Sequence, residues 1–388
     1  MKDIVFVFPA GCYPVPAING GAVESLITNL INENEKQHKF NFHVIMCKHF
    51  NDKTNYDYSK YKHTKFYDFY QKDIFFKVGR LVNAVNKRLN YMFGFYSPFE
   101  KFIVQIIRKV NPQKVIFEGT FNVSVRKIKK ICGKKNIVWH VHHQVIPKYK
   151  VNKHVGSILC VSDYIKRDWK ESEKLPKDFE YIVLKNTLTS TSFFNKVSEK
   201  EKRELKEKYD IKEDDFVIVF CGRLVKEKGI DILIKAINRL NNKKIKLMII
   251  GESAFKNSIV TPYVKYLKDL VNENNNIFFT GYVDNYKIHK YYSLANLQVI
   301  PSVCEEAAPV AAIEGRMMGL PQIITNSGGL PEYASDSAVM VIKEDNLQES
   351  LELEINKHFK EKPSNVDDKE KDVLSVEKYF NDFYELFK

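Results

Sequence analysis

The chain has 388 residues, of which 44% are hydrophobic and 13% aromatic, so a disordered protein is excluded and two folded domains are expected. Its net charge of +13 is uneven, because residues 1–190 hold 32 Lys and Arg against 16 Asp and Glu, whereas residues 191–388 hold 29 against 32. No run of 18 apolar residues occurs, and the apolar run before Pro9 is too short for a signal peptide. We therefore expect a cytoplasmic protein that is soluble or rests on a membrane surface.

Short apolar runs alternate with longer amphipathic ones along the chain, which is typical of parallel βαβ units. The strands predicted in the first half are residues 3–9, 41–47, 114–119, 136–142, 157–162 and 181–186. Those predicted in the second half are residues 216–222, 246–251, 276–281, 297–302, 321–326 and 338–342. Several runs are apolar on both faces, as strands covered by helices on each side must be. Helices are predicted between them, for example over residues 230–240 and 262–274.

The domain boundary is expected in the polar stretch 187–215, which contains one helical segment and joins two predicted strands. We predict a first domain over residues 1–190 and a second over residues 191–371, with a last helix, about residues 372–388, that packs back on the first. Residues 50–98 lack a clear strand rhythm, and we expect them to form an insertion at the ligand face of the first domain. The pattern predicts an α/β protein with two doubly wound domains that face each other across a cleft.

Ligands of open α/β sheets bind at the carboxyl ends of the strands, so the residues that follow each strand are the candidates. After the first strand, Gly20 and Gly21 precede a helical run, where backbone N–H groups can meet an anion. The alternative for this glycine pair is an ordinary tight turn.

Three histidines, His140, His142 and His143, lie at the end of the predicted strand 136–142. His140 and His142 alternate onto the same face of the strand. A zinc site would need a third ligand, and none lies at a suitable spacing, so we expect no metal. A histidine at a strand end suits hydrogen bonding to a polar substrate, or proton handling.

The stretch 220–231 carries two cations where a strand ends and a helix begins. Arg223 and Lys228 flank a loop that Gly229 closes. Arginine can hold a diphosphate with two parallel hydrogen bonds, while lysine acts as a compact point charge. The alternative is a solvated basic loop.

Two glutamates, Glu306 and Glu314, follow the predicted strand 297–302. Pro309 stands between them, and proline fits the first turn of a helix but not its interior. We therefore place Glu306 in a loop and Glu314 on a helix that ends at Gly319. Carboxylates recognise sugar hydroxyls well because they accept two hydrogen bonds at once.

Together these stretches resemble the retaining glycosyltransferases of family 4. GRLVKEKGID (222–231) is similar to the family's G-R-x-x-x-x-K-G loop, and EAAPVAAIE (306–314) to its E-x7-E motif. GLPQIITNSGGLPE (319–332) is similar to the G-x-P-x-I-x-T-x-x-G-G-x-x-E continuation. Weaker matches in the same order are Gly20, Gly21, His142, Ser162 and Asn186.

The resemblance implies the GT-B fold, in which a first Rossmann-like domain binds the acceptor and a second binds a nucleotide sugar. It implies that Arg223 and Lys228 hold the donor diphosphate, that His142 and Glu306 contact the sugar, and that Glu314 binds the ribose. The catalytic residues would be His142, Glu306, Arg223 and Lys228. The donor-binding residues would be Gly20, Gly21, Arg223, Lys228, Glu306, Ala307, Ala308, Pro309, Val310 and Glu314.

The donor implied by the resemblance is a uridine diphosphate sugar, and no cofactor or metal is expected because Arg223 and Lys228 replace the cation. Ala308 and Pro309 stand where the family often has Phe-Gly, and Asn186-Thr187-Leu188 replaces the commoner Asn-Gly, so the donor sugar is left open. Alternatives are a nucleotide-sugar hydrolase or epimerase, a glucan phosphorylase, and a non-catalytic subunit that binds a partner transferase.

The acceptor is expected to be a saccharide or a lipid-linked molecule of cell-surface glycoconjugate synthesis. A basic cluster in the first half suits an anionic membrane surface or a phosphate-bearing acceptor, with a merely solvated basic face as the alternative. No nucleic acid is expected, because no nucleic-acid-binding motif accompanies the cluster. The cluster consists of Arg126, Lys127, Lys129, Lys130, Lys134 and Lys135.

Overall fold

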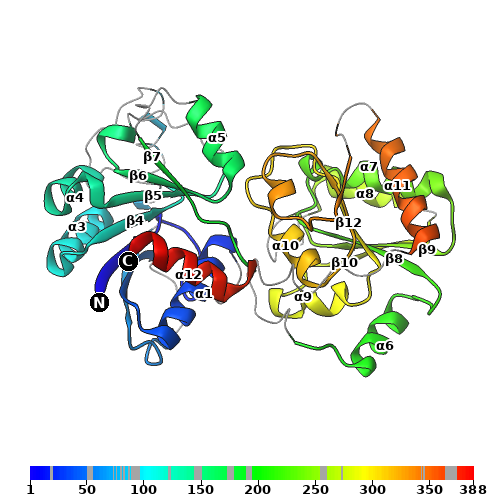
Figure 1. Ribbon diagram of the computed structural model, residues 1–388, viewed down its shortest axis with the longest axis horizontal. Helices are drawn as coiled ribbons and strands as arrows, with labels where there is room; N and C mark the ends of the chain where they lie inside the picture. Colours follow the sequence, from blue (N-terminus) through cyan, green and yellow to red (C-terminus); the bar gives the residue numbers. More distant parts are fainter. Residues whose placement is uncertain are drawn as a thin grey trace. The chain divides into compact units, whose positions relative to one another are not determined.

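The chain divides into two compact units, which are Met1–Asn186 with Val376–Lys388, and Thr187–Ser375. Figure 1 shows the computed structural model. The structure describes all residues except 18–20, 50–55, 73, 76, 79–80, 82–83, 86–87, 89–96, 121–123, 144–150, 173–178, 189–194, 254–259, 272–273, 342, 344–345 and 363–373. The division after Asn186 lies four residues before the boundary expected from the sequence.

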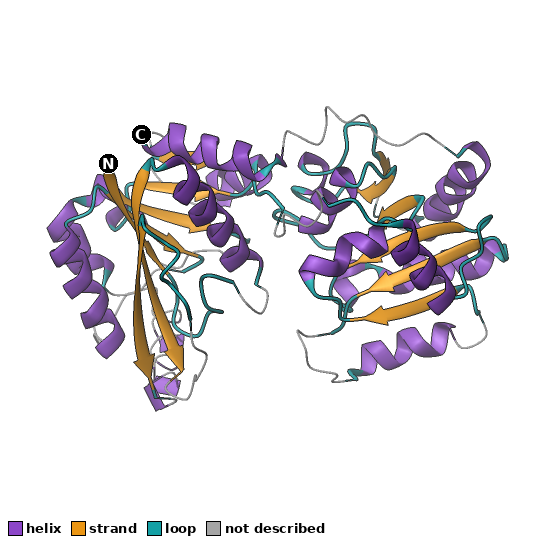
Figure 2. Cartoon of the chain, turned by 90° about the horizontal axis from the view of Figure 1, so that it is seen from below, coloured by secondary structure: helices purple, strands orange, loops and turns teal. Residues whose placement is uncertain are grey.

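The first unit is built on a parallel sheet of seven strands in the order β3-β2-β1-β4-β5-β6-β7. The strands are β1 (Lys2–Val7), β2 (Phe40–His49), β3 (Thr64–Gln71), β4 (Lys114–Glu118), β5 (Ile137–Val141), β6 (Ser157–Cys160) and β7 (Glu180–Val183). The helices between them are α1 (Ala22–Gln37), α3 (Pro98–Val110), α4 (Val125–Cys132) and α5 (Asp163–Ser172). Helices cover both faces of the sheet (Figure 2), as the continuous apolar runs required.

Strand β3 was not predicted, and the expectation that residues 50–98 form an insertion is wrong for this part of them. Thr64–Gln71 pairs with β2 over eight residues, from Phe42 with Thr64 to His49 with Gln71. The strand lies at the edge of the sheet. An edge strand is half exposed and tolerates charged and aromatic side chains, so its sequence lacks the apolar run of a central strand.

The C-terminal helix α12 (Val376–Phe387) packs against α1 of the first unit, although more than 180 residues of the second unit precede it. Figure 1 shows the two helices side by side. Phe383 is buried in a cluster of aromatic rings, with ring centroids 5.8 Å from Phe40 and 6.0 Å from Phe6 and Phe42. The aromatic residues at helical spacing are therefore the apolar stripe by which this helix is held.

The second unit is built on a parallel sheet of six strands in the order β10-β9-β8-β11-β12-β13. The strands are β8 (Phe216–Cys221), β9 (Ile245–Ile250), β10 (Ile277–Gly281), β11 (Leu297–Ile300), β12 (Gln322–Thr325) and β13 (Val339–Val341). The helices are α6 (Glu199–Lys208), α7 (Ile230–Leu240), α8 (Pro262–Val271), α9 (Asn285–Tyr292), α10 (Val310–Met317) and α11 (Leu347–Glu361). The prediction of two doubly wound Rossmann-like units is confirmed.

Strand β8 shows how the sequence places this sheet between two layers of helices. Phe216, Ile218 and Phe220 belong to the apolar cluster formed with α7, α8 and α11. Val217 and Val219 belong to the cluster formed with α9 and α10. Because side chains alternate along a strand, a run that is apolar at every position must be covered on both faces. In the part of the chain that the structure describes, no helix is both long and apolar enough to cross a bilayer.

Candidate active site

Each sheet has one point at which the strand order reverses, and the candidate residues gather there. In the second unit the chain runs from β8 outward to β10 and then returns to β11, which pairs with β8. In the first unit β4 pairs with β1 in the same way, after the chain has run outward to β3. The loops that leave two such neighbouring strands diverge to opposite sides, which opens a site at their carboxyl ends.

The loop after β8 carries the predicted cations and is held against the end of β11 by a glycine. Gly229 precedes α7 with a φ of 65°, a left-handed conformation that favours glycine. A Cβ atom at this position would lie 2.0 Å from the carbonyl oxygen of Pro301, which follows β11. Only glycine therefore fits here, and the turn Lys226–Lys228 is brought to the carboxyl end of the neighbouring strand.

Lys228 and Glu306 meet at this point, although they lie 78 residues apart in the sequence. The Lys228 ammonium forms an ion pair and hydrogen bond with Glu306 Oε1. Ser302 Oγ donates a second hydrogen bond, of 2.6 Å, to the same oxygen, and the Gly329 N–H donates to the Glu306 carbonyl at 2.6 Å. Glu306 is buried. Lys228 and Ser302 thus hold the carboxylate, and Gly329 holds the backbone of the same residue.

Arg223 differs from Lys228 in its surroundings. It is exposed, and it forms no ion pair with another described residue. Arg223 follows β8 by two residues and Lys228 by seven, so both cations belong to the loop at the carboxyl end of this strand, and a guanidinium with an ammonium suits a diphosphate.

Residues 307–310 lead from Glu306 into α10. Ala307, Ala308, Pro309 and Val310 are all half-buried. Pro309 is the N-cap residue of α10, as predicted, and no side chain caps this helix end. The first N–H groups of α10 are therefore directed out of the helix, although Pro309 itself has no N–H to contribute.

Glu314, the predicted ribose ligand, lies on α10 and is buried. Its Oε2 accepts a hydrogen bond of 3.0 Å from the Tyr292 hydroxyl, and Cys221 is its other hydrogen-bond partner. Gln298 Nε2 donates to the same tyrosine oxygen at 3.1 Å. Burial raises the pKa of Glu314 to about 7, against the opposing effect of the hydrogen bonds from Tyr292 and Cys221. Its partners are thus residues of the interior and not the Lys228–Glu306 pair.

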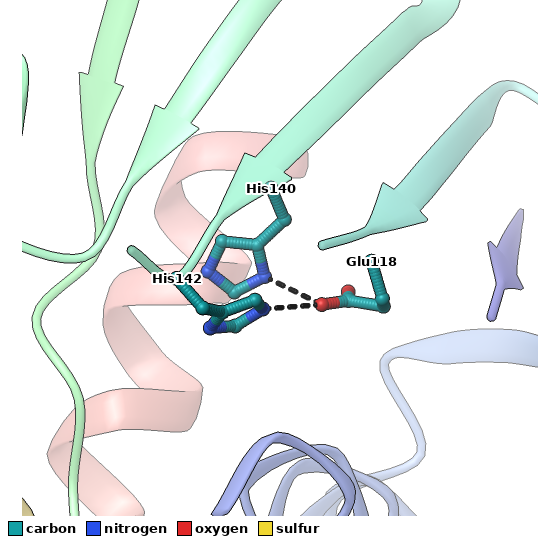
Figure 3. A group of neighbouring side chains, drawn as sticks. All are labelled: Glu118, His140 and His142. Atoms are coloured by element: carbon teal, nitrogen blue, oxygen red, sulfur yellow. Dashed lines mark hydrogen bonds and ion pairs between the residues drawn. The ribbon is translucent and has the colours of Figure 1, made fainter. Parts of the chain in front are cut away.

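The first unit places a second group at its own switch point, made of Glu118 with His140 and His142 (Figure 3). Glu118 ends β4, His140 lies in β5, and His142 follows β5 directly. Glu118 Oε2 lies 3.0 Å from His140 Nδ1 and 2.7 Å from His142 Nε2. The two imidazole ring centroids are 4.0 Å apart. The alternation that puts both histidines on one face was predicted, whereas Glu118 was missed.

Burial and the contacts among the three side chains together determine the charges in this Glu118–His140–His142 cluster. The side chains of Glu118, His140 and His142 are 1%, 2% and 8% exposed. Burial and the neighbouring His140 lower the pKa of His142 to about 4, so its imidazole is neutral at pH 7. The pKa of Glu118 falls to about 2, because the interactions with His140 and His142 outweigh the burial that would raise it.

Among the described residues, these three side chains form a group that could hold a metal ion. One ligand atom of each lies within 4.8 Å of the other two. The sequence analysis expects no zinc because it finds no third ligand at a suitable spacing, whereas Glu118 places a third group of ligand type beside the two histidines. The signal that could have found it is a carboxylate at the end of the apolar run KVIFE, where a buried charge needs a partner.

Gly21 precedes α1 with a φ of 100°, and Gly20 lies outside the described residues. A Cβ atom on Gly21 would lie 2.3 Å from Glu24 Oε2, so the missing side chain leaves room for this carboxylate. Glu24 Oε1 accepts a hydrogen bond of 3.1 Å from the Tyr13 N–H. The first turn of α1 therefore already holds an acid.

Ser162, a weaker match to the family pattern, lies directly before α5. Its hydroxyl accepts a hydrogen bond of 3.2 Å from the Ile165 N–H.

The basic cluster lies on α4 and on the turn Lys134–Asn136 after it. Lys127, Lys130 and Lys135 are exposed. Lys129 Nζ and Lys134 Nζ donate to backbone carbonyls of residues 153 and 152, at 3.0 and 3.2 Å. The cluster is thus a basic surface of the first unit, and two of its lysines are bound to the backbone of the turn Val151–Lys153.

Residues 201–372 match the family model described as "Glycosyl transferases group 1". A similar protein is the lipopolysaccharide 1,2-N-acetylglucosaminetransferase of Salmonella typhimurium, which is 25% identical over 62% of this chain and 62% of its own length. The chain thus spans about three fifths of that relative.

Two solved structures are similar over the whole chain. HepE of Anabaena, solved in complex with UDP and glucose, has a TM-score of 0.70 at 16% identity, over 100% of this chain and 99% of that one. A glycosyltransferase of Rickettsia africae has a TM-score of 0.75 at 17% identity, over 100% and 98%. At these identities the likeness shows the fold, and the predicted GT-B class is confirmed.

Proposed function

Because residues 201–372 match the model of the group 1 glycosyltransferases, we propose that this chain transfers a sugar from a nucleoside diphosphate sugar to a saccharide or lipid-linked acceptor, with retention of configuration and without a metal. The observation that carries the proposal is the junction of β8 and β11, where Lys228, Arg223 and Glu306 gather at the switch point of the sheet. The donor in this proposal is a uridine diphosphate sugar, which the Anabaena complex with UDP and glucose supports.

Each residue has a role that follows from its chemistry. Arg223 and Lys228 neutralise the donor diphosphate and the charge that develops on it as it leaves. Glu306, fixed by Ser302, accepts hydrogen bonds from sugar hydroxyls. In the free protein Lys228 pairs with Glu306. When the donor binds, its diphosphate contacts the Lys228 ammonium and its sugar hydroxyls contact the Glu306 carboxylate.

The transfer breaks the bond between the anomeric carbon and the phosphate oxygen and forms a bond from that carbon to the acceptor oxygen. Attack occurs on the same face as departure, and the acceptor's proton passes to the departing phosphate. The nucleoside diphosphate therefore serves as the base, and the cations of the β8 loop stabilise it. His142 contacts the sugar in this proposal.

The acceptor belongs to cell-surface polysaccharide or glycoconjugate synthesis, and the protein works at the inner face of a membrane. The name of the Salmonella relative supports the pathway. The basic cluster on α4 supports an anionic membrane surface, since each basic residue near such a surface contributes about 1 kcal/mol. Among the described residues of the segment 74–88, Ile74, Phe75 and Leu81 expose large apolar side chains, which suits the same contact.

A thermal-shift screen of nucleotide sugars, run with EDTA, tests the donor class. The expected result is that one uridine diphosphate sugar raises the melting temperature strongly, because only a ligand that binds the folded state stabilises it. The stabilising sugar is then offered to acceptors, and the anomeric configuration of the product is read by NMR. Release of free sugar without an acceptor would replace the transferase by a hydrolase, and the absence of any nucleotide binding would favour the non-catalytic subunit.

Matched variants test the residues. Glu306→Gln should lower kcat at least 100-fold, because an amide cannot offer the same charge and acceptors to the reacting sugar. Glu305→Gln is the control, since Glu305 is its exposed neighbour and pairs with Lys343 at the surface. Equal activity of the two variants would refute the role of Glu306.

A further inference from the structure

Buried amide side chains form a continuous chain of hydrogen bonds beneath α10, the helix that carries Glu314. The Ser335 N–H donates to Gln322 Oε1 at 2.6 Å, and Gln322 Nε2 donates to Gln298 Oε1 at 2.6 Å. Gln298 Nε2 donates to the Tyr292 hydroxyl at 3.1 Å, and this hydroxyl donates to Glu314 Oε2 at 3.0 Å. All of these residues are buried. The chain therefore connects the segment before β13 to the carboxyl group of Glu314.

Backbone groups fix the direction of this chain, because each of them can act in one way only. The Ser335 N–H can only donate, so the Gln322 atom that faces it must be the oxygen. Gln322 Nε2 also donates to the Ala312 carbonyl at 2.9 Å, and a carbonyl can only accept. Gln298 Nε2 likewise donates to the Ala311 carbonyl at 2.7 Å. The backbone thus determines the orientation of both amides.

Tyr292 therefore meets Glu314 as a hydrogen-bond donor. Its oxygen already receives the Gln298 N–H, and its own hydrogen is directed to Glu314 Oε2. Cys221 is hydrogen-bonded to both Tyr292 and Glu314. Burial raises the pKa of Glu314, and the hydrogen bonds from Tyr292 and Cys221 oppose this rise. One oxygen of the carboxyl is thus held by a group whose own orientation is set elsewhere in the fold.

The same amides hold α10 against the sheet. Gln298 in β11 and Gln322 in β12 are paired directly across the two strands. Their side chains bind the carbonyls of Ala311 and Ala312, which lie in the first turn of α10. A Cβ atom on Gly315 would lie 1.8 Å from Gln298 Oε1, so any side chain there would displace the amide. The amide pair therefore sets the position of the helix and of the carboxyl on it.

The Glu314 carboxyl reaches the strand that leads to the cations of the site. Its hydrogen-bond partner Cys221 is the last residue of β8, and Arg223 follows two residues later. In a nucleoside diphosphate the ribose is bonded directly to the first phosphate. A diphosphate bound by the cations of the β8 loop would therefore bring its ribose to the same end of the sheet as Glu314.

We propose that Tyr292 and Gln298 are positioning residues for nucleoside recognition, which hold Glu314 by its Oε2 so that the carboxylate accepts hydrogen bonds from the ribose hydroxyls of the donor. The inference rests on the proposed transfer from a uridine diphosphate sugar, and it names residues that decide how the ribose of that donor is recognised. In this arrangement neither Tyr292 nor Gln298 contacts the nucleotide, and both act through Glu314.

The competing role is a buried polar chain that only stabilises the second sheet. Substitutions in such a chain would distort the whole site, so they would weaken every nucleotide to the same extent. A positioning role predicts the selective loss of one preference, which is that for ribose over 2′-deoxyribose. UDP and 2′-deoxy-UDP differ by a single hydroxyl and share the base and the diphosphate, so their affinities separate the two roles.

Calorimetric titration of both nucleotides into the full chain at pH 8, above the Glu314 pKa of about 7, provides the test. The unchanged protein should bind UDP at least about tenfold more tightly than 2′-deoxy-UDP, because a site that binds a hydroxyl rejects an analogue lacking it. In Tyr292→Phe this preference should fall to about threefold or less, mainly through weaker UDP binding. Tyr291→Phe is the matched control and should keep the full preference. Tyr291 is the half-buried neighbour on α9, and its hydrogen-bond partner is Tyr209.

Two further variants examine whether the residues act as a unit. Glu314→Gln should lower the preference to the same level, and Tyr292→Phe added to it should change the preference no further. Gln298→Met keeps the length of the side chain and removes both of its donors. It should lower the preference as well, and it provides the test of positioning if Tyr292→Phe does not fold.

A folded Tyr292→Phe or Gln298→Met protein with the full preference for ribose would overturn the inference, as would an unchanged protein without this preference. Equal weakening of UDP and 2′-deoxy-UDP in Tyr292→Phe would also overturn it, in favour of the purely structural role. Failure of the unchanged protein to bind UDP would have a different meaning, because it would refute the proposed function on which the inference rests.

Discussion

The buried carboxyl of Glu314 should make the stability of the second unit fall as the pH rises. Its pKa is about 7 in the folded protein, against an ordinary value of 4.5. Below pH 4.5 both the folded and the unfolded chain hold the proton. Between about pH 4.5 and 7 the unfolded chain releases it first, so the free energy of unfolding falls by about 1.4 kcal/mol per pH unit. The total loss is about 3 kcal/mol, and it is complete above pH 7.

Glu314→Gln isolates this effect because glutamine has the same shape, remains neutral and can still accept the Tyr292 hydrogen bond. At pH 4 the variant and the unchanged protein should be equally stable, whereas at pH 8 the variant should be more stable by about 3 kcal/mol. Urea unfolding, monitored by far-UV circular dichroism, measures the free energy of unfolding of both proteins at each pH. The difference between the two proteins cancels the contribution of all other titrating groups. Both tryptophans, Trp139 and Trp169, lie in the first unit, so their fluorescence provides an internal reference.

A difference between the two proteins that is the same at pH 4 and pH 8 would refute this reasoning. It would mean that Glu314 is ionised in the folded protein and that its burial is compensated by groups other than Tyr292 and Cys221. The outcome also bears on function, because a neutral carboxyl donates one hydrogen bond, whereas a carboxylate accepts from both ribose hydroxyls.

Two further substitutions test the packing that supports the site. Gly229→Ala should destabilise the second unit by at least about 1–2 kcal/mol and abolish donor binding. The reason is that the new methyl group meets the Pro301 carbonyl in a left-handed turn. An unchanged melting temperature would contradict this. Phe383→Ala should lower the stability of the first unit by about 3–5 kcal/mol in tryptophan fluorescence, because it empties a buried aromatic site. The control Leu386→Ala, at a position on the same helix that is 37% exposed, should change it by less than about 1 kcal/mol.

Patterns that depend on neighbouring residues were readable from the sequence. Helix α7 begins and ends at the predicted residues 230 and 240, and Pro309 precedes α10 as expected. The alternation of His140 and His142 onto one face was also correct. In each case the cause is local, since strand alternation, proline geometry and glycine turns act within a few residues.

The partners of the site residues could not be predicted, because they come from distant strands. Glu118 meets the two histidines only because β4 pairs with β5, which brings residues 22 and 24 positions apart together. Glu314 turns to Tyr292 because α9 and α10 cover the same face of the second sheet. Strand β3 was missed because an edge strand need not be apolar. Long-range pairing, which periodicity does not contain, decided the first two cases, and the exposure of an edge strand decided the third.

The measurement that tests the account most directly is calorimetric titration of UDP into matched lysine variants in the presence of EDTA. Lys228 pairs with Glu306 at the switch point, whereas Lys226 is exposed on the same turn. We expect the unchanged protein and Lys226→Ala to bind UDP with similar affinity and Lys228→Ala to bind it at least tenfold more weakly, since a charged hydrogen bond to the diphosphate is lost. Equal affinity of the two variants, or binding that EDTA abolishes, would contradict a metal-independent donor site at the ends of β8 and β11.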